Sequence, residues 1–269
     1  MLVSFVLIIS PKSSAIMPLT LGRALQALFL KLVSTQNSRL AEELHAPARF
    51  KPYTISPLRG QLLAENGGLL ARAGQRYWLR ITSIDEKLSQ TILTLDRHLP
   101  DRINILKNIF DVSGTALNPV QLPWAVTTTY GSLYNQAGTA ESDIDFEFSS
   151  PTTFRSGKIN TPFPLPGLVF GSLIKKWNFF APSPVSIDLI SLVEEQVLLS
   201  RYELKTHMLD YNDKRQVGFE GKCKFVLPDS GDNGLSAVIN LLADFAFFAG
   251  VGAKTTMGMG QARRLVQNY

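Results

Sequence analysis

Apolar residues open the chain in a continuous run and then recur with helical spacing. Residues 1–9 are almost all apolar, which predicts a buried first strand. Leu21, Leu25, Leu28 and Leu32 then place apolar side chains on one face of a helix. The chain is therefore expected to begin with a buried strand followed by an amphipathic helix.

Further helical and strand patterns follow in the same half. A looser helical segment over 36–44 ends at His45, and Pro47 stops it. The remaining predicted elements are a strand over 50–58, a loop or short hairpin over 60–74 with a turn at Gly67-Gly68, a half-exposed strand over 76–84, a capped helix over 85–99 and a strand over 103–112. This β-α-β-β-α-β order predicts a ferredoxin-like domain over residues 1–124.

The pattern restarts less clearly in the second half. The predicted elements are a strand over 125–129, a short helix over 130–136, a strand over 144–148, a loop or irregular hairpin over 150–167, helices over 168–180 and 187–196, a hairpin of 198–208 and 216–227 across Asn212-Asp213, and a last helix over 236–249. A second ferredoxin-like domain over residues 125–269 fits this order. The predicted fold class is α+β, with two tandem ferredoxin-like (RRM-like, βαββαβ) domains.

A glycine-rich loop joins the last helix to a basic strand. Its glycines form two G-x-G pairs, Gly250 with Gly252 and Gly258 with Gly260, and Lys254 lies between the pairs. Glycine permits positive φ angles and close backbone approach, so the amides of this loop could face phosphate oxygens. Nucleotide-binding motifs place their glycines between a strand and a following helix, which is the reverse order. A helix C-cap followed by a surface loop is the alternative interpretation.

Composition and the number of cysteines limit the classes of protein to which this chain can belong. An apolar content of 45% with 18% charged residues is typical of a soluble globular protein. The single cysteine, Cys223, excludes an internal disulfide or a cysteine-based zinc cluster and fits a reducing cytoplasm. The apolar start is too short to cross a bilayer and lacks the basic residues of a signal peptide. We therefore expect a cytoplasmic protein without a membrane partner.

Positive charge is concentrated in the first half. The net charge is +5; residues 1–125 carry 14 Lys/Arg against 8 Asp/Glu (+6), and residues 126–269 carry 13 against 14 (−1). This imbalance suits a polyanionic partner, although many basic proteins bind none. The run Asp143-x-Asp145-x-Glu147 is better explained as the solvated face of a strand than as a metal site, and no metal or other cofactor is expected.

Several blocks of the sequence resemble a known family. A helix, a G-h-G-(x5)-G-h-G loop (h apolar) and a basic strand resemble the signature loop of the RAMP superfamily of CRISPR-associated RNA-binding proteins. The blocks at 28–30, 44–58, 150–157, 162–166 and 170–173 resemble the CRISPR repeat-processing endoribonucleases. The resemblance implies two ferredoxin-like domains side by side. It also implies metal-independent cleavage of precursor CRISPR RNA, in which a 2′-hydroxyl attacks and leaves 2′,3′-cyclic phosphate and 5′-hydroxyl ends.

The resemblance assigns roles to two residues of the first domain. His45 occupies the family's catalytic position, and imidazole exchanges protons close to neutral pH. Lys51 stands where the family often has a phosphate-stabilising lysine. The alternatives are a histidine that caps a helix C-terminus and a solvated lysine at the start of a strand. His98 and His207 are weaker candidates, expected at a helix end and in a strand.

The sequence departs from one version of the family triad. That version has a tyrosine in the first helix, whereas here no tyrosine precedes Tyr53. Lys31, Arg39 or an RNA group could take its role, or two residues could suffice. The departure mildly favours the rival interpretation, a non-catalytic RAMP-type subunit that holds CRISPR RNA in an effector complex.

The expected ligand is CRISPR repeat RNA, held by contacts to phosphate and by shape. The candidate RNA-binding residues are Gly250, Gly252, Lys254, Gly258, Gly260, Arg263, Arg155, Lys158, Arg23 and Arg49. For each of the basic side chains, an ordinary solvated charge is the alternative. Effector-complex subunits are further expected partners, and the chain is expected to be a monomer or a weak homodimer.

Overall fold

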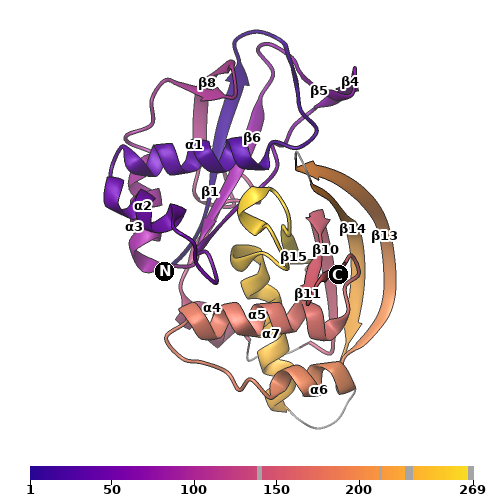
Figure 1. Cartoon of the computed structure of the whole chain (residues 1–269). Helices are drawn as coiled ribbons and strands as arrows, with labels where there is room; N and C mark the ends of the chain where they lie inside the picture. The colour runs from indigo at the N-terminus through magenta and orange to yellow at the C-terminus, as the bar shows by residue number, and fades with distance from the viewer. Residues whose placement is uncertain (138–140, 212–213, 228–232, 266–269) are drawn as a thin grey trace. The chain divides into compact units, whose positions relative to one another are not determined.

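A computed structural model describes residues 1–137, 141–211, 214–227 and 233–265 (Figure 1). The chain divides into two compact units. Unit 1 contains Met1–Thr127 together with Thr256–Gly258, and unit 2 contains Thr128–Thr255 together with Met259–Tyr269. Each unit carries its own antiparallel sheet, and each is described separately.

Unit 1 is built on the sheet order β3-β6-β1-β8-β7, and β9 also pairs with β1. Its βαββαβ core is β1, α1, β3, β6, α3 and β8, and a second small sheet has the order β2-β5-β4. The strands are β1 (Leu2–Pro11), β2 (Ala15–Met17), β3 (Tyr53–Ile55), β4 (Leu63–Glu65), β5 (Gly68–Ala71), β6 (Tyr77–Ser83), β7 (Arg102–Ile105), β8 (Asn108–Ala116) and β9 (Val126–Thr128). The helices are α1 (Gly22–Ser34), α2 (Ser38–His45) and α3 (Glu86–Leu95). The predicted ferredoxin-like order is confirmed for this unit.

The central strand β1 is apolar throughout because both of its faces are covered. Phe5 and Leu7 are fully buried in the main core, which also contains Leu25 of α1. Val6 points to the opposite side and packs with Ala116 and Ala125 in a smaller cluster. A strand buried on both faces loses the apolar–polar alternation of a half-exposed strand, which accounts for the continuous run at the start of the sequence.

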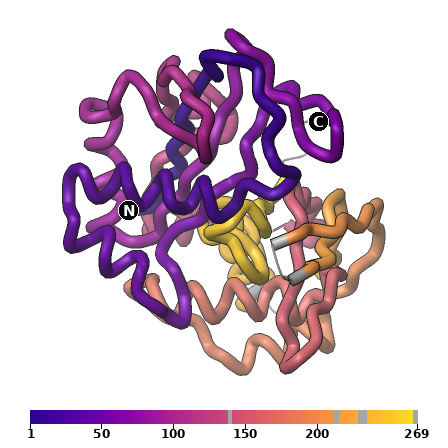
Figure 2. Tube along the Cα trace, turned by 45° about the horizontal axis from the view of Figure 1, so that its top comes forward, coloured from indigo at the N-terminus to yellow at the C-terminus, as the bar shows by residue number. Residues whose placement is uncertain are grey.

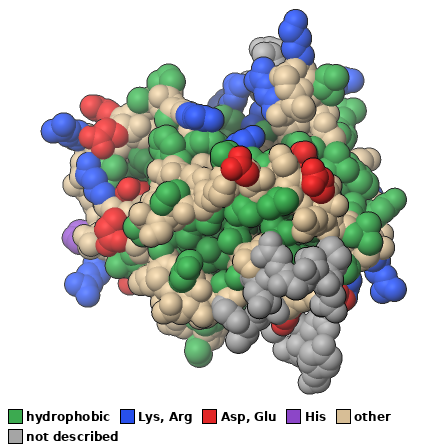
Figure 3. All heavy atoms as spheres, turned by 90° about the horizontal axis from the view of Figure 1, so that it is seen from below, with side chains coloured by type: hydrophobic (Ala, Val, Ile, Leu, Met, Phe, Trp, Pro, Cys, Tyr) green, Lys and Arg blue, Asp and Glu red, His purple; other side chains and the backbone are tan. Residues whose placement is uncertain are grey.

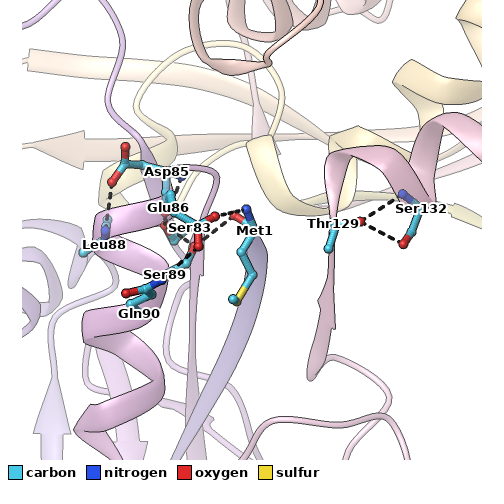
Figure 4. A network of polar contacts seen from close by, with 9 residues as sticks. All are labelled: Met1, Ser83, Asp85, Glu86, Leu88, Ser89, Gln90, Thr129 and Ser132. Carbon is cyan, nitrogen blue, oxygen red and sulfur yellow. Dashed lines mark hydrogen bonds and ion pairs between the residues drawn. The ribbon is translucent and has the colours of Figure 1, made fainter.

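Polar caps fix the first turn of α3 (Figure 4). The Asp85 side chain accepts a hydrogen bond from the Leu88 amide at 2.8 Å, as its N-cap position predicts. The Met1 amino group lies 2.5 Å from the carboxylate of Glu86, and Ser89 Oγ donates to the Met1 carbonyl at 3.1 Å. These contacts tie the start of β1 to the start of α3.

Unit 2 repeats the topology with additions. Its sheet has the order β13-β14-β10-β15, and its βαββαβ core is β10, α5, β13, β14, α7 and β15. The strands are β10 (Asp143–Thr152), β11 (Phe154–Ser156), β12 (Ile159–Thr161), β13 (Leu198–Tyr211), β14 (Lys214–Val226) and β15 (Ala262–Leu265). The helices are α4 (Tyr130–Gln136), α5 (Pro166–Phe180), α6 (Leu189–Gln196), α7 (Asn233–Ala249) and the 3-10 turn η1 (Thr255–Met257), of which Thr256 and Met257 belong to unit 1. Figure 2 traces the loop that leaves α7 toward β15 in yellow.

Aromatic rings make the core of unit 2. Phe146 of β10 lies edge-on to Phe170 of α5 at 6.5 Å, and Phe170 contacts Phe225 of β14 at 5.1 Å. Trp177 of α5 meets Phe245 of α7 at 5.1 Å. These edge-to-face contacts hold both helices against the sheet.

Several expected elements differ in the structure. The strand expected at 125–129 pairs with β1 of unit 1, so β10 is the first strand of the second ferredoxin-like core. The single strand expected at 103–112 is instead the hairpin of β7 and β8. The strand expected at 50–58 is only three residues long, and the helix expected at 85–99 ends at Leu95. The predicted turn at Asn212-Asp213 lies outside the described residues.

Two further expectations failed for local reasons. The turn expected at Gly67-Gly68 is formed by Asn66 and Gly67, which both have positive φ, while Gly68 already belongs to β5. Strand β6 is not half-exposed, because Arg80 and Thr82 are buried. Arg80 Nε donates to Ser4 Oγ at 2.7 Å, and its guanidinium lies over the Trp124 ring, which makes a buried arginine tolerable.

Candidate active site and glycine-rich loop

His45 is the last residue of α2, and its side chain is exposed. Leu40, Ala41 and Leu44 are buried and anchor the helix, and Asn37 caps its N-terminus by accepting from the Leu40 amide at 2.9 Å. A short helix with a buried face and a capped start presents its last residue in a defined position. The imidazole forms no hydrogen bond or ion pair with the described residues and is therefore open to a ligand.

Lys51 contacts the backbone on both sides of His45. Its ammonium is therefore not a freely solvated charge. Its ammonium donates to the Leu44 carbonyl at 2.7 Å and also to the Ala46 carbonyl, the two peptide oxygens that flank His45. Partial burial lowers the pKa of Lys51. The alternative of a free charge at the start of a strand is therefore wrong: Lys51 caps the C-terminus of α2, where a cation is favoured by the helix dipole.

The two other candidate cations of unit 1 are exposed. Arg49 lies between His45 and Lys51 in sequence, and its guanidinium is 5.3 Å from the centre of the Phe50 ring. Arg23 lies in the first turn of α1. On the neighbouring surface, Glu43 pairs with both Arg39 and Lys87, at 3.3 and 3.1 Å.

The glycine-rich loop has the predicted backbone conformation. Gly250, Gly252, Gly258 and Gly260 have φ angles of 61°, 76°, 88° and 69°. A Cβ at Gly260 would lie 2.1 Å from the Val251 carbonyl oxygen, so this position excludes any side chain. Positive φ and close backbone approach therefore explain these glycines.

The amides of these glycines do not face an open phosphate site. All four donate to oxygens of the protein: Gly250 to Ala246 O at 2.9 Å, Gly252 to Ser172 Oγ at 3.4 Å, Gly258 to Ile55 O at 3.1 Å and Gly260 to Pro151 O at 3.1 Å. The expectation that they point at phosphate is corrected accordingly. The loop is held by its own backbone, and any contact with RNA would fall to its side chains.

A buried lysine fixes the start of this loop. Lys176 of α5 is 6% exposed, and its ammonium donates to the carbonyls of Ala249 and Gly250 at 2.6 and 3.1 Å. Burial lowers the pKa of Lys176 to about 7. The sequence shows only an ordinary Lys-Lys pair here, so this anchor was missed.

The tip of the loop belongs to unit 1. Gln26 of α1 donates to Thr256 Oγ1 at 3.2 Å and to the Tyr53 hydroxyl at 3.0 Å. A Cβ at Gly22 would lie 2.0 Å from the Met257 carbonyl oxygen, so the N-terminus of α1 is in direct contact with the tip. Burial raises the pKa of Tyr53, and this tyrosine is 1% exposed, which excludes it as a ready substitute for the missing helix tyrosine.

The remaining candidates lie in unit 2. Lys254 is half-buried at a positive φ of 54° between the glycine pairs. Arg263 Nε lies 2.6 Å from Glu147, so its charge is already offset. Arg155 and Lys158 are exposed in the hairpin of β11 and β12, and Arg155 Nε donates to the Gly157 carbonyl at 3.3 Å. The hairpin therefore presents two cations to solvent.

The two weaker histidine candidates have local partners. His98 Nδ1 is 2.8 Å from the Thr94 carbonyl after the end of α3, which confirms the expected helix-end position. His207 Nε2 lies 3.3 Å from Glu220 on the adjacent strand. Both basic and acidic side chains occur on the face shown in Figure 3.

The described residues contain no group of three or more His, Cys, Asp or Glu side chains arranged to hold a metal ion. Asp145 and Asp143 instead pair with Lys224, at 3.5 and 3.1 Å. In the same part of the chain, every helix is too short or too polar to span a bilayer.

Comparison with known proteins agrees with this architecture of two ferredoxin-like units and a glycine-rich loop. The family model of the CRISPR Cas6 N-terminal domain matches residues 1–135, about half of the chain. The model of the CRISPR-associated endoribonuclease Cas6 matches residues 146–262. The class of protein is therefore a CRISPR-associated protein with a double ferredoxin-like fold. Within that class, the chain belongs to the CRISPR-associated endoribonuclease Cas6 family.

Individual relatives give the same family. The Cas6 endoribonuclease of Streptococcus thermophilus is 30% identical over 115 residues, which is 42% of this chain and 46% of that protein. The Mycobacterium tuberculosis Cas6 is 31% identical over 121 residues, or 44% of this chain and 37% of that protein. Both matches span less than half of the relative's length.

Solved structures match over nearly the whole chain. A Thermus thermophilus Cas6 in a product complex is 27% identical, with a TM-score of 0.83 over 98% of this chain and all of that one. A Cas6-related protein from Pyrococcus furiosus is 13% identical, with a TM-score of 0.66 over the full length of both chains, and supports the fold alone.

Proposed function

We propose that this chain is a metal-independent endoribonuclease that cleaves CRISPR repeat RNA in precursor CRISPR RNA. The attacking 2′-oxygen forms a bond to the adjacent phosphorus as the bond to the 5′-oxygen breaks. The 2′-hydroxyl loses its proton, and the departing 5′-oxygen gains one. The products are a 2′,3′-cyclic phosphate and a 5′-hydroxyl.

The observation that best supports this proposal is the exposed imidazole of His45, which lies at the end of α2, a helix held in place by its buried face. Such a group can take or give a proton at a ribose without first breaking a contact within the protein. Membership of the Cas6 family supports the same role. The Thermus thermophilus relative was solved as a product complex, which supports an RNA ligand for this fold.

Lys51 has a double role in this proposal. An ammonium has three donors, and two of them bind the carbonyls on either side of His45. The third donor is left to meet a phosphate oxygen as negative charge develops. Lys51 would thus position His45 and stabilise the pentavalent phosphorane.

RNA binding would use cationic side chains in both units. Arg23, Arg49, Arg155, Lys158 and Lys254 are the retained candidates, while Arg263 would have to share its charge with Glu147. Gly250, Gly252, Gly258 and Gly260 would act by shaping the loop that carries Lys254. We further propose that the chain acts through two domains, expected from the sequence over 1–124 and 125–269, whereas the compact units divide after Thr127 and unit 1 also includes Thr256–Gly258. A cytoplasmic location, a monomer or weak homodimer, and contacts with effector-complex subunits complete the proposal.

The decisive experiment is cleavage of repeat RNA in EDTA, with and without a 2′-deoxy substitution at the scissile position. We expect cleavage to persist in EDTA, to stop with the deoxy substrate, and to yield a cyclic phosphate by mass spectrometry. A requirement for added metal, or cleavage of the deoxy substrate, would refute the mechanism.

His45→Ala is the matched protein variant. Loss of the proton-transfer group should lower the single-turnover rate by at least about 10²-fold, while RNA affinity changes little, because the side chain is exposed and supports no packing. His98→Ala is the control, since that ring contacts only its own helix end in the described structure. Unchanged cleavage by His45→Ala would exclude the assigned role.

A second candidate function is a non-catalytic subunit that holds CRISPR RNA. It is favoured by the absence of a tyrosine before Tyr53 and by the engagement of Lys51 with backbone carbonyls. Tight binding without any cleavage by the wild-type chain would select it.

A further inference from the structure

Three turns meet at one end of the unit 1 sheet. Lys12 directly follows β1, and its amide donates to the Ile109 carbonyl of β8 at 3.0 Å. The turn between β5 and β6 is joined to the same place, because the Gly74 amide donates to the Pro11 carbonyl at 3.2 Å. The turn between β7 and β8 precedes Phe110, which pairs with Pro11.

Each of these turns carries basic residues, which we call the turn-end patch. Its members are Lys12, Arg72, Arg76 and Lys107. All four are exposed, and none of their side chains forms a hydrogen bond or an ion pair with the described residues. No Asp or Glu occurs in residues 11–14, 72–76 or 106–109.

Three other cations of the same unit are offset by carboxylates. Arg39 and Lys87 share Glu43, and Arg102 pairs with Asp111 at 3.1 Å. Asp111 lies opposite Ser10 and is the nearest carboxylate in the β1–β8 ladder, but Arg102 already engages it. The turn-end patch therefore keeps its full positive charge, and this concentration of unpaired cations favours a polyanion.

The patch is remote from His45. Strand β6 begins with Tyr77, next to Arg76, and ends with Ser83, and the following residue, Ile84, donates to the Pro52 carbonyl beside Lys51 at 2.9 Å. At about 3.3 Å per residue, the seven residues of β6 separate the two places by roughly 20 Å. A ligand that touches both must be an extended chain of charges.

We propose that the turn-end patch binds the phosphate backbone of a single-stranded part of the repeat RNA, away from the scissile phosphate. This inference rests on the proposed function and adds a substrate-binding surface to it. The four cations contact phosphates and set affinity without taking part in the chemistry. Their removal changes binding and its salt dependence, not the rate of the bound complex.

The test compares Lys12→Gln/Arg76→Gln with a control that removes the same charge elsewhere, Lys87→Gln/Lys175→Gln. Affinity for repeat RNA is measured from 50 to 300 mM salt. Each lost phosphate contact on a single strand lowers the slope of log K against log salt by about 0.7, so the test variant loses about 1.4. Affinity at the lowest salt falls about tenfold or more, and the control remains close to wild type.

Two further measurements distinguish a loss of RNA binding from a loss of cleavage. Single-turnover cleavage at saturating RNA stays within about twofold of wild type, whereas half-saturation shifts with affinity. A short RNA that covers only the cleavage site binds wild type and test variant equally, because it does not reach the patch. Melting curves confirm that both variants fold.

Equal affinity and salt slope for wild type and test variant would overturn the proposal. An equal loss of RNA affinity in the control variant would also overturn it. So would a test variant that binds repeat RNA like wild type but no longer binds anionic vesicles that wild type binds. A wild-type chain that binds repeat RNA but never cuts it would overturn the nuclease function alone, because the affinity and slope measurements still decide the role of the patch.

Discussion

At the scale of single residues, His45 depends on contacts made by its neighbours. Leu44 is buried, and its carbonyl and that of Ala46 are both bound by Lys51. The backbone on either side of the imidazole is therefore restrained while the ring stays exposed. In the proposed mechanism, Lys51 would thus act through this backbone as well as by contacting a phosphate oxygen.

Substitutions at Lys51 separate its two roles. Lys51→Met removes the donors to both carbonyls and the cation, so we expect single-turnover cleavage to fall by about 10²-fold or more. Lys51→Arg keeps the positive charge and several donors and should recover part of the loss. Added to His45→Ala, Lys51→Met should cost little further, because the two residues act as a unit. Fully multiplicative losses in the double variant would contradict this coupling.

The glycines provide a matched pair of substitutions. Gly260→Ala places a Cβ 2.1 Å from the Val251 oxygen, whereas Gly258→Ala meets its nearest atom, Pro57 N, at 3.5 Å. Both positions have positive φ and share a conformational cost of roughly 1–2 kcal/mol. Gly260→Ala should therefore lower the melting temperature clearly more than Gly258→Ala. Equal shifts would show that φ alone matters here.

At the scale of elements, Lys176 couples α5 to the end of α7 through a buried charge. Its pKa is lowered from the model-compound value of 10.5 to about 7, because burial penalises the ammonium form. Between these values the unfolded chain binds more protons than the folded one, so stability rises with pH. The penalty is fully present below about pH 7 and disappears toward pH 10.5.

Lys176→Met removes this pH dependence. The free energy of unfolding of wild type, minus that of Lys176→Met, should increase from pH 6.5 to 9.5 by about 3 kcal/mol. Lys175→Met is the control, because Lys175 is the exposed neighbour on the same helix. Urea unfolding at several pH values provides the measurement. A constant difference between wild type and Lys176→Met would show that burial does not shift this lysine.

Elements with a strong local signal, such as a long apolar run, an apolar helix face or a capping residue, could be predicted from the sequence. The apolar run of β1, the leucine face of α1 and the Asp85 cap of α3 are of this kind. The β7–β8 hairpin was missed because its turn contains Leu106 at a φ of 56°, without a glycine or asparagine. Strand β9 has only three residues, and nothing in them indicates which sheet they join.

The residues of the candidate site were proposed from the sequence, but their contacts could not be predicted. His45 and Lys51 came from a resemblance, and no pattern indicated that Lys51 would bind the carbonyls around His45. Lys176 and Gln26 were missed because their partners lie 73 and 230 residues away in the sequence. Such long-range polar contacts leave no local periodicity.

At the scale of the whole molecule, unit 1 includes three residues from the far end of the sequence. Thr256 accepts from Gln26, and the Gly258 amide donates to Ile55. We expect Gln26→Ala and Thr256→Ala to show a coupling of about 0.5–1.5 kcal/mol in a double-mutant cycle of thermal stability. Gln26→Ala with Thr161→Ala, a threonine of unit 2, should be additive. Additivity in the first cycle would mean that the observed hydrogen bond contributes nothing.

The membership of Thr256–Gly258 in unit 1 also bears on biosynthesis. During translation, α1 and β3 leave the ribosome long before Gly258 is added. The Ile55 carbonyl therefore cannot accept the hydrogen bond of the Gly258 amide until unit 2 has been almost entirely synthesised. Unit 1 can collapse early, but it acquires its last backbone partner late. A nascent chain that stalls after α7 would therefore hold two incomplete units at once, and both would mature together when the glycine-rich loop emerges.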